Sequence, residues 1–151
     1  QFEDDTLTAN FPHLIELCSL IEPLGIPWCT PNGIKVNYHL RKQNELFNRM
    51  AHAGCYQITL ACESGSQHTL DDVIEKNLRL EHVAPTIERA KEAGLLVHTF
   101  WIVGFPGETR EAMEQTVEFA SQSGADSYSL SILTPLPGTP IYRRVMRENL
   151  W

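Results

Sequence analysis

The chain has 151 residues, of which 42% carry hydrophobic side chains, so it can bury the core of one globular domain. Its formal net charge of -7 argues against partners with a negative surface, and we expect neither nucleic acid nor an anionic membrane as a partner. No apolar run approaches the roughly 20 residues that span a bilayer. The first ten residues lack the order of a signal peptide, so we expect a cytoplasmic protein.

The first predicted helix covers residues 11–21, where Asn10 can cap the amino end and apolar side chains recur on one stripe. A strand over residues 28–36 is expected next. Three later segments share one plan: an amphipathic helix, a glycine that ends it in the left-handed conformation, a short strand and a polar loop. The three glycines are Gly54, Gly94 and Gly124, and the strands end at Glu63, Val103 and Leu133.

Helices that alternate with short strands predict an α/β fold with parallel pairing through right-handed crossovers. We expect about four to five parallel strands with helices on the outer face. A closed eight-stranded barrel needs roughly 200 residues or more, so this chain forms an arc of a barrel or an open sheet. The chain begins at Gln1 without a methionine, and we expect it to be a piece of a longer protein.

Strand alternation predicts which side chains meet the helices. In the strand that ends at Glu63 the apolar face carries Ile58, Leu60 and Cys62, and in the last strand it carries Tyr128, Leu130 and Ile132. The opposite face is small and polar, with Thr59, Ala61 and Glu63 on one strand and Ser127, Ser129 and Ser131 on the other. This pattern suits a lumen that binds a ligand better than a tightly packed barrel core.

The loops that follow the strands are the expected place for function, because sites in such folds lie beyond the carboxyl ends of the strands. They read ESGS from Glu63, GFPGET from Gly104 and TPLPGTP from Thr134, and FEDDTLT opens the chain at Phe2. Glu63 is the most informative residue, because a carboxylate on the inner face at a strand end must be solvated, paired or bound to a ligand.

In this order, FEDDTLT, AGC followed by ESGS, Lys76, AGL, WIVGFPGET and PLPGTP resemble the radical S-adenosylmethionine (radical SAM) enzymes, most closely the cobalamin-domain-containing class. The resemblance extends over nearly the whole chain. It implies a partial (β/α)6 barrel, in which a 4Fe-4S cluster reductively cleaves S-adenosylmethionine to a 5'-deoxyadenosyl radical. It also implies methyl transfer, ring rearrangement or another radical conversion as the reaction of the parent enzyme.

The resemblance implies a role for each matching position. Two acceptor oxygens at Glu63 suit the vicinal diol of the ribose, and an aspartate in FEDDTLT would bind the amino group of the cofactor. The implied cofactor-binding residues are Asp4 or Asp5 for the amino group, Glu63 and Ser64 for the ribose, Lys76 for the carboxylate, and Ile102, Gly104, Leu133 and Thr134 for the adenine.

The chain departs from the family pattern in one respect, because it lacks the CxxxCxxC loop that ligates the cluster. Its cysteines, Cys18, Cys29, Cys55 and Cys62, occur singly, and we predict free thiols and no metal site among them. Residues 1–151 then form the C-terminal portion of a barrel domain. The cluster ligands, and any cobalamin domain, belong to the missing part of the parent, and the isolated chain is expected to be inactive.

Two other interpretations remain open at this point. A barrel hydrolase could use Glu63 and Glu108 as an acid/base pair without a cofactor, although Glu108 also suits a helix start, where it complements the dipole. A non-catalytic interaction module would agree with the missing cysteine motif and the open sheet edges of a partial barrel. His98 either contacts the substrate or is a hydrogen-bonded histidine of the barrel.

Overall fold

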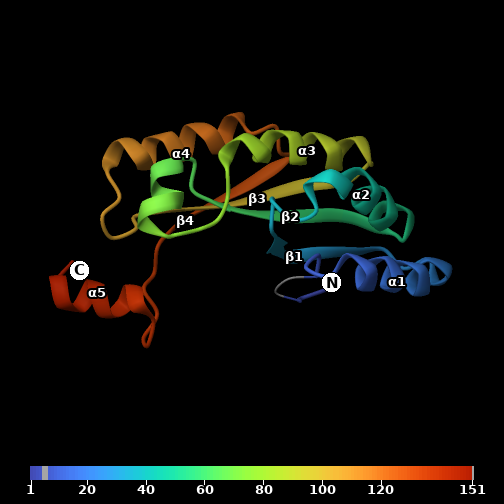
Figure 1. Cartoon of the computed structure of the whole chain (residues 1–151), viewed down its shortest axis with the longest axis horizontal. Coiled ribbons are helices and arrows are strands. Elements are labelled where there is room, and N and C mark those ends of the chain that lie inside the picture. Colours follow the sequence, from blue (N-terminus) through green and yellow to red (C-terminus); the bar gives the residue numbers. More distant parts are fainter. Residues whose placement is uncertain (5–6, 151) are drawn as a thin grey trace.

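A computed structural model describes residues 1–4 and 7–150, and it contains a single sheet covered by helices (Figure 1). The longer elements in chain order are α1 (Phe11–Ile21), β1 (Trp28–Ile34), α2 (Gln43–His52), β2 (Cys55–Glu63), α3 (Val83–Glu92), β3 (Leu96–Val103), α4 (Arg110–Gln122), β4 (Ser127–Ile132) and α5 (Pro140–Glu148). The shorter helical turns are η1 (Glu22–Leu24), η2 (Leu40–Lys42), η3 (Thr69–Val73) and η4 (Leu80–His82).

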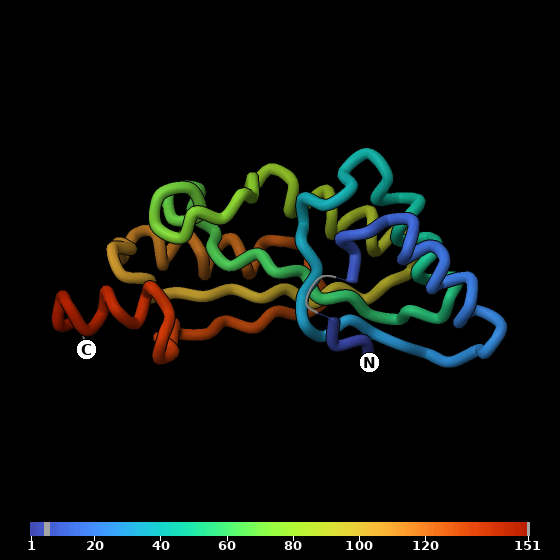
Figure 2. The backbone as a smooth tube through the Cα atoms, turned by 60° about the horizontal axis from the view of Figure 1, so that its bottom comes forward, coloured from blue at the N-terminus to red at the C-terminus, as the bar shows by residue number. Residues whose placement is uncertain are grey.

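The four strands are all parallel and lie in the order β1-β2-β3-β4. Helices α2, α3 and α4 cover one face of the sheet, and α1 packs against α2 beside β1 (Figure 1). Helix α5 extends beyond the carboxyl end of β4 and does not return over the sheet (Figure 2). This arrangement confirms the predicted arc of parallel β/α units.

The helix ends follow the predicted chemistry. Asn10 caps α1, because its side-chain oxygen accepts a hydrogen bond from the His13 amide at 3.1 Å. The glycine that follows each of α2, α3 and α4 has a positive φ, of 91°, 85° and 83° in turn. Glycine takes this left-handed conformation without steric cost, so each helix can turn directly into the following loop or strand.

The core lies between the helices and the sheet. Ile58, Leu60 and Cys62 of β2 are fully buried on the helix face, as the alternation predicts. Trp101 on β3 packs against Phe119 of α4, with ring centroids 5.6 Å apart. The four cysteines are buried free thiols. Burial raises the pKa of Cys55 and of Cys62 to about 12, so both stay protonated at neutral pH.

The prediction that Tyr128, Leu130 and Ile132 meet helices is wrong. Their side chains are 47%, 41% and 80% exposed. They do point to the helix face, because Leu130 is the pairing partner of buried Trp101. However, β4 is the edge of the sheet, and α4 packs toward β3 and the loop after β2. With α5 displaced, α4 makes only a small contact with β4, and these three residues stay largely exposed.

The face opposite the helices, here called the lumen face, is small and polar on β2 and β4, as predicted, whereas β3 adds the apolar side chains of Phe100 and Ile102 to it. Register places Thr59, His98 and Ser127 in one row across three strands. The His98 ring nitrogens bond the hydroxyls of Ser127 at 2.8 Å and Ser129 at 3.0 Å. Partial burial lowers the pKa of His98 below its ordinary value, which favours the neutral ring. His98 is therefore a hydrogen-bonded histidine of the lumen face.

Candidate functional site

A cleft of about 510 Å³ opens where β1, β2 and β3 end, at the edge where function is expected in strand-then-helix folds. It is lined by Lys35, Glu63, Ile74, Glu75, Lys76, Asn77, Ile102 and Phe105. Three of the sequence-predicted residues, Glu63, Lys76 and Ile102, therefore lie in one cleft, although Glu63 and Ile102 come from different strands.

Glu63 is the last residue of β2, and its backbone φ of 68° is left-handed. This conformation is uncommon for a residue with a side chain. The Lys76 ammonium lies 2.7 Å from Glu63 Oε1, and both side chains are about one quarter exposed, at 23% and 25%. A ligand in the cleft can thus reach a carboxylate and an ammonium at the same point.

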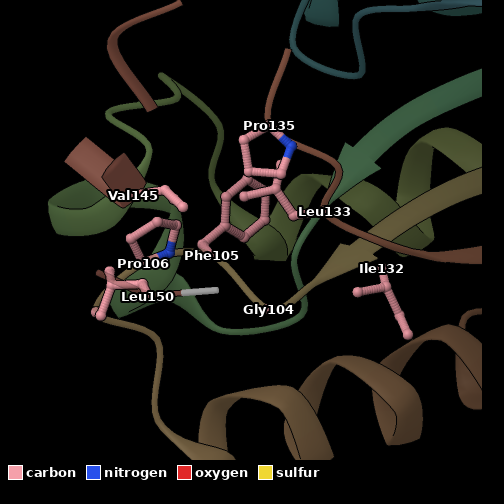
Figure 3. A pocket seen from close by; sticks show the side chains of 9 residues that line it. Gly104, Phe105, Pro106, Ile132, Leu133, Pro135, Val145 and Leu150 are labelled. Carbon is pink, nitrogen blue, oxygen red and sulfur yellow. The ribbon is translucent and has the colours of Figure 1, made fainter. Parts of the chain in front are cut away.

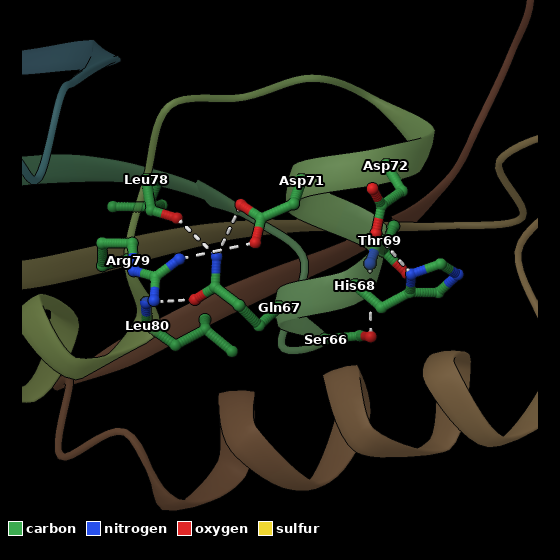
Figure 4. A network of polar contacts seen from close by, with 9 residues as sticks. All are labelled: Ser66, Gln67, His68, Thr69, Asp71, Asp72, Leu78, Arg79 and Leu80. Atoms are coloured by element: carbon green, nitrogen blue, oxygen red, sulfur yellow. Dashed lines mark hydrogen bonds and ion pairs between the residues drawn. The ribbon is translucent and has the colours of Figure 1, made fainter.

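The loop that carries Lys76 is fixed by the side-chain amide of Gln67 (Figure 4). Its nitrogen donates to the Leu78 carbonyl at 3.0 Å, and its oxygen accepts from the Leu80 amide at 3.0 Å. The same nitrogen donates to Asp71 at 2.9 Å, so η3 is joined to the returning chain. Lys76 itself donates its backbone amide to the Leu70 carbonyl at 2.7 Å. These bonds hold the position of Lys76.

Ser64 does not reach the cleft with Glu63. Its side chain is fully buried, and its hydroxyl lies 3.1 Å from Thr116 Oγ1 on α4. The neighbouring Gly65 packs so closely on α4 that an added Cβ would lie 2.7 Å from Phe119 Cβ. The chain changes direction after Glu63, so Ser64 and Gly65 lie in the helix layer. Ser64 therefore anchors the end of β2 to α4.

The Glu108 carboxylate is hydrogen-bonded to the loop that precedes it. Its Oε2 accepts hydrogen bonds from the amides of Gly104 at 2.6 Å and Phe105 at 3.1 Å. Thr109, rather than Glu108, caps α4 by accepting from the Ala112 amide at 3.2 Å. The carboxylate therefore braces the GFPG turn, which accounts for Glu108 without a role as one member of a hydrolytic acid/base pair.

A second cavity, of about 380 Å³, adjoins the cleft and is mostly apolar (Figure 3). Its walls come from the loop after β3, the chain after β4 and α5. Phe105 lines both the cavity and the cleft, so the two meet at this residue. The lining residues are Gly104, Phe105, Pro106, Gly107, Ile132, Leu133, Pro135, Val145 and Leu150. Two further sequence-predicted residues, Gly104 and Leu133, are thus brought together here.

The remaining predicted residues lie elsewhere. Thr134 is exposed and lines neither cavity. Asp4 is exposed at the end of the segment that lies along β1, where the Phe2 amide donates to the Cys29 carbonyl at 3.0 Å. Asp5 lies outside the described residues. Neither cavity includes Asp4 in its lining.

Sequence reasoning missed Lys35 and Phe105, which the structure places in the cleft. Each had a signal: Lys35 directly follows β1 at the functional edge, and Phe105 lies inside the GFPGET motif. Among residues 1–4 and 7–150 no group of three or more His, Cys, Asp or Glu side chains could hold a metal ion. None of the described helices is long and apolar enough to cross a membrane.

Comparison with known proteins decides the family. The sequence profile of the Radical SAM superfamily matches residues 3–120. This chain belongs to the radical SAM superfamily. Among its relatives, the cytidylyl-2-hydroxyethylphosphonate methyltransferase of Streptomyces wedmorensis is 35% identical over 97% of this chain and 28% of its own length. The anaerobic magnesium-protoporphyrin IX monomethyl ester cyclase of Cereibacter sphaeroides is 29% identical over 94% of this chain and 23% of its own length.

Solved radical SAM structures share the fold. The radical S-adenosylmethionine methyltransferase TsrM from Kitasatospora setae, solved with cobalamin and a 4Fe-4S cluster bound, superposes with a TM-score of 0.79 at 16% identity. The match covers 95% of this chain and 29% of TsrM. Coproporphyrinogen III oxidase HemN from Escherichia coli gives a TM-score of 0.70 at 13% identity, over 85% of this chain and 30% of HemN. The family and the barrel-type fold inferred from the sequence motifs are confirmed.

Proposed function

We propose that this chain is the C-terminal portion of the barrel domain of a radical SAM enzyme, and that its cleft and apolar cavity together bind S-adenosylmethionine. The chain spans less than a third of the length of the relatives described above, at 28% and 23%. The activity therefore belongs to a longer protein. Methyl transfer is the reaction class that we propose, because the Streptomyces relative and TsrM are both methyltransferases.

One observation carries this proposal: a polar cleft and an apolar cavity adjoin at the strand ends and meet at Phe105. A nucleoside has a similar division between a polar sugar and a flat base whose faces are apolar. The Glu63 carboxylate offers two acceptor oxygens to the ribose diol. Ile102 and the bare backbone of Gly104 would border the adenine, with Leu133 on the far side of the cavity.

The chain's own residues would bind and orient the cofactor. The Glu63–Lys76 pair places an acceptor for hydroxyl groups next to a donor for the cofactor's carboxylate. When bound beside a reduced cluster, S-adenosylmethionine supplies the radical that starts the reaction in this superfamily. Ser64 acts indirectly in this proposal, by holding the end of β2 against α4.

The cysteines of this chain do not fit a cluster. All four are buried free thiols, and among the described residues no three His, Cys, Asp or Glu side chains are grouped where they could hold a metal ion. We propose that a segment outside residues 1–151 holds the 4Fe-4S cluster, and that any cobalamin is bound by another part of the parent enzyme.

The test is a titration of S-adenosylmethionine into the full-length enzyme that carries this chain, compared with its Glu63→Gln variant. Loss of a charged hydrogen-bond acceptor costs about 1.5–3 kcal/mol, so the Kd should rise about tenfold or more. Glu75→Gln, which changes an exposed carboxylate lining the same cleft, is the control and should change the Kd less than about twofold.

A matched ligand makes the test specific for the ribose. The 2'-deoxy analogue of S-adenosylmethionine lacks one hydroxyl of the diol, so it should bind the unmodified enzyme more weakly. The Glu63→Gln variant should discriminate little between the two ligands. Equal discrimination in both proteins would refute the ribose role of Glu63, and failure of the enzyme to bind S-adenosylmethionine at all would refute the proposed function.

A further inference from the structure

Lys35 is a cation of the cleft that the cofactor assignment does not use. It directly follows β1, it is exposed, and its side chain lines the same cleft as Glu63. Its ammonium lies 5.2 Å from the centre of the Tyr38 ring, a cation–π distance that holds the side chain at the rim. Among the described residues no carboxylate forms an ion pair with Lys35.

Among the described residues of the lining, neither carboxylate forms an ion pair with Lys35. Lys76 is neutralised by Glu63 at 2.7 Å. Glu75 also lines the cleft, but it is exposed and forms no ion pair with a described residue, so it does not neutralise Lys35 directly. Of the described lining residues, Lys35 is therefore an ammonium without an ion-pair partner, and Glu75 is a carboxylate without one.

The position of Lys35 in the sheet separates it from the nucleoside. In the order β1-β2-β3, Glu63 at the end of β2 lies between Lys35 after β1 and Ile102 on β3. A nucleoside bound from Ile102 to Glu63 would leave Lys35 on the open flank of the cleft. The chain as a whole carries a charge of -7 and would repel an anionic substrate. A cation at the rim offsets that repulsion at the entrance.

We propose that Lys35 is a specificity-determining residue that binds an anionic group of the substrate, a phosphate, phosphonate or carboxylate. This inference rests on the proposed function, because it assumes that the cofactor occupies the cleft from Glu63 to Ile102. The ammonium binds the anion as a point charge with three donors, and arginine keeps the positive charge at this position.

Inorganic phosphate is the probe, titrated by calorimetry into the full-length enzyme at a constant ionic strength of about 0.15 M, where long-range attraction is largely screened. Lys35→Gln should weaken phosphate binding about tenfold, and Lys35→Arg should retain it. Lys42→Gln is the matched control, because the Lys42 ammonium also lies over a ring, that of Phe11 at 4.6 Å, but outside the cleft. It should leave phosphate binding unchanged.

The same variants are titrated with S-adenosylmethionine to identify the source of the anion. An unchanged Kd for S-adenosylmethionine in Lys35→Gln supports a substrate anion. A tenfold weaker Kd would instead assign Lys35 to the cofactor's carboxylate and overturn the inference. Phosphate binding that is absent from the unmodified enzyme, or equal in Lys35→Gln, would also overturn it. The Glu63→Gln titration reports on the proposed function separately.

Discussion

Two adjacent residues, Glu63 and Ser64, have opposite environments. The left-handed backbone at Glu63 leaves the carboxylate in the cleft and turns the Ser64 hydroxyl into the helix layer. Thr116 stabilises this turn through two hydrogen bonds. Its hydroxyl lies 3.1 Å from the Ser64 hydroxyl and accepts a hydrogen bond from the Gly65 amide at 3.0 Å. The orientation of Glu63, the residue proposed to bind the ribose, thus depends on the buried Thr116 hydroxyl of α4.

The Thr116 hydroxyl can be tested by two substitutions that differ in which atoms they remove. Thr116→Val keeps the shape but leaves the buried Gly65 amide without its acceptor, which should cost about 1–3 kcal/mol. Thr116→Ser keeps the hydroxyl and loses one methyl group, for about 1 kcal/mol. Urea unfolding measures both free energies. Valine should be the more destabilising variant, and equal losses would show that the hydroxyl contributes little.

At the scale of elements, the loop between β2 and η4 is a returning segment joined by one side chain. Gln67 bonds both Leu78 and Leu80, and it also contacts Asp71 on η3 (Figure 4). Two backbone hydrogen bonds, from the Lys76 amide to the Leu70 carbonyl and from the Leu78 amide to the Lys76 carbonyl, also hold the returning chain. The Gln67 amide is the side chain that bonds both η3 and the returning chain, so the order of the loop should depend on it.

Replacing Gln67 by alanine removes the acceptor of the Leu80 amide and the donor to the Leu78 carbonyl. We expect amide hydrogen exchange over residues 76–80 to accelerate about tenfold, because local opening becomes easier, and S-adenosylmethionine affinity to fall with it. His68→Ala is the control, since the pair that it removes with Asp72 is 65% and 67% exposed. Exchange rates that are the same in both variants would contradict the role given to Gln67.

Local sequence signals predicted the elements well. The Asn10 cap and the glycines after α2, α3 and α4 act through backbone geometry within a few residues, so their effect can be recognised without tertiary contacts. The exposed face of β4 could not be predicted in this way. Alternation identifies an apolar face, but whether a helix covers it depends on the path of α5, which is a tertiary property.

The candidate site was predicted in part for the same reason. Glu63 follows from its place on the inner face at the end of a strand, whereas Ile102 follows only from the resemblance of WIVGFPGET to the family motif. The burial of Ser64 depends on one φ angle at the preceding residue, and sequence does not reveal a left-handed glutamate. Lys35 and Phe105 enter the cleft through the arrangement of three loops, which no single motif encodes.

At the scale of the whole molecule, one edge of the sheet, at β4, has an exposed apolar face. Strand β4 is an edge strand, and on its helix face Tyr128, Leu130 and Ile132 are all exposed. Val117 of α4, 45% exposed, adds to the apolar surface that the described chain leaves to solvent. Exposed edges of this kind promote association between copies of a chain.

Substituting the most exposed of these residues should reduce such association. Ile132→Thr keeps a β-branched side chain that suits a strand, so the free energy of unfolding should change by less than about 0.5 kcal/mol. Light scattering of this chain over a concentration series should show less self-association. Leu20→Gln, which removes a leucine that is 67% exposed on α1, is the control. If both variants lower association equally, the β4 edge has no special part in it.

The backbone of Glu63 also affects how the protein can change under selection. A residue with a side chain in the left-handed region carries strain of about 1–3 kcal/mol, and glycine at position 63 would relieve it. A library selected for heat resistance alone would therefore enrich glycine there. Those clones would lack the carboxylate proposed for cofactor binding. Thermal tolerance and the proposed cofactor binding are therefore opposed at this position, so a stabilised variant that is meant to keep cofactor binding should retain Glu63.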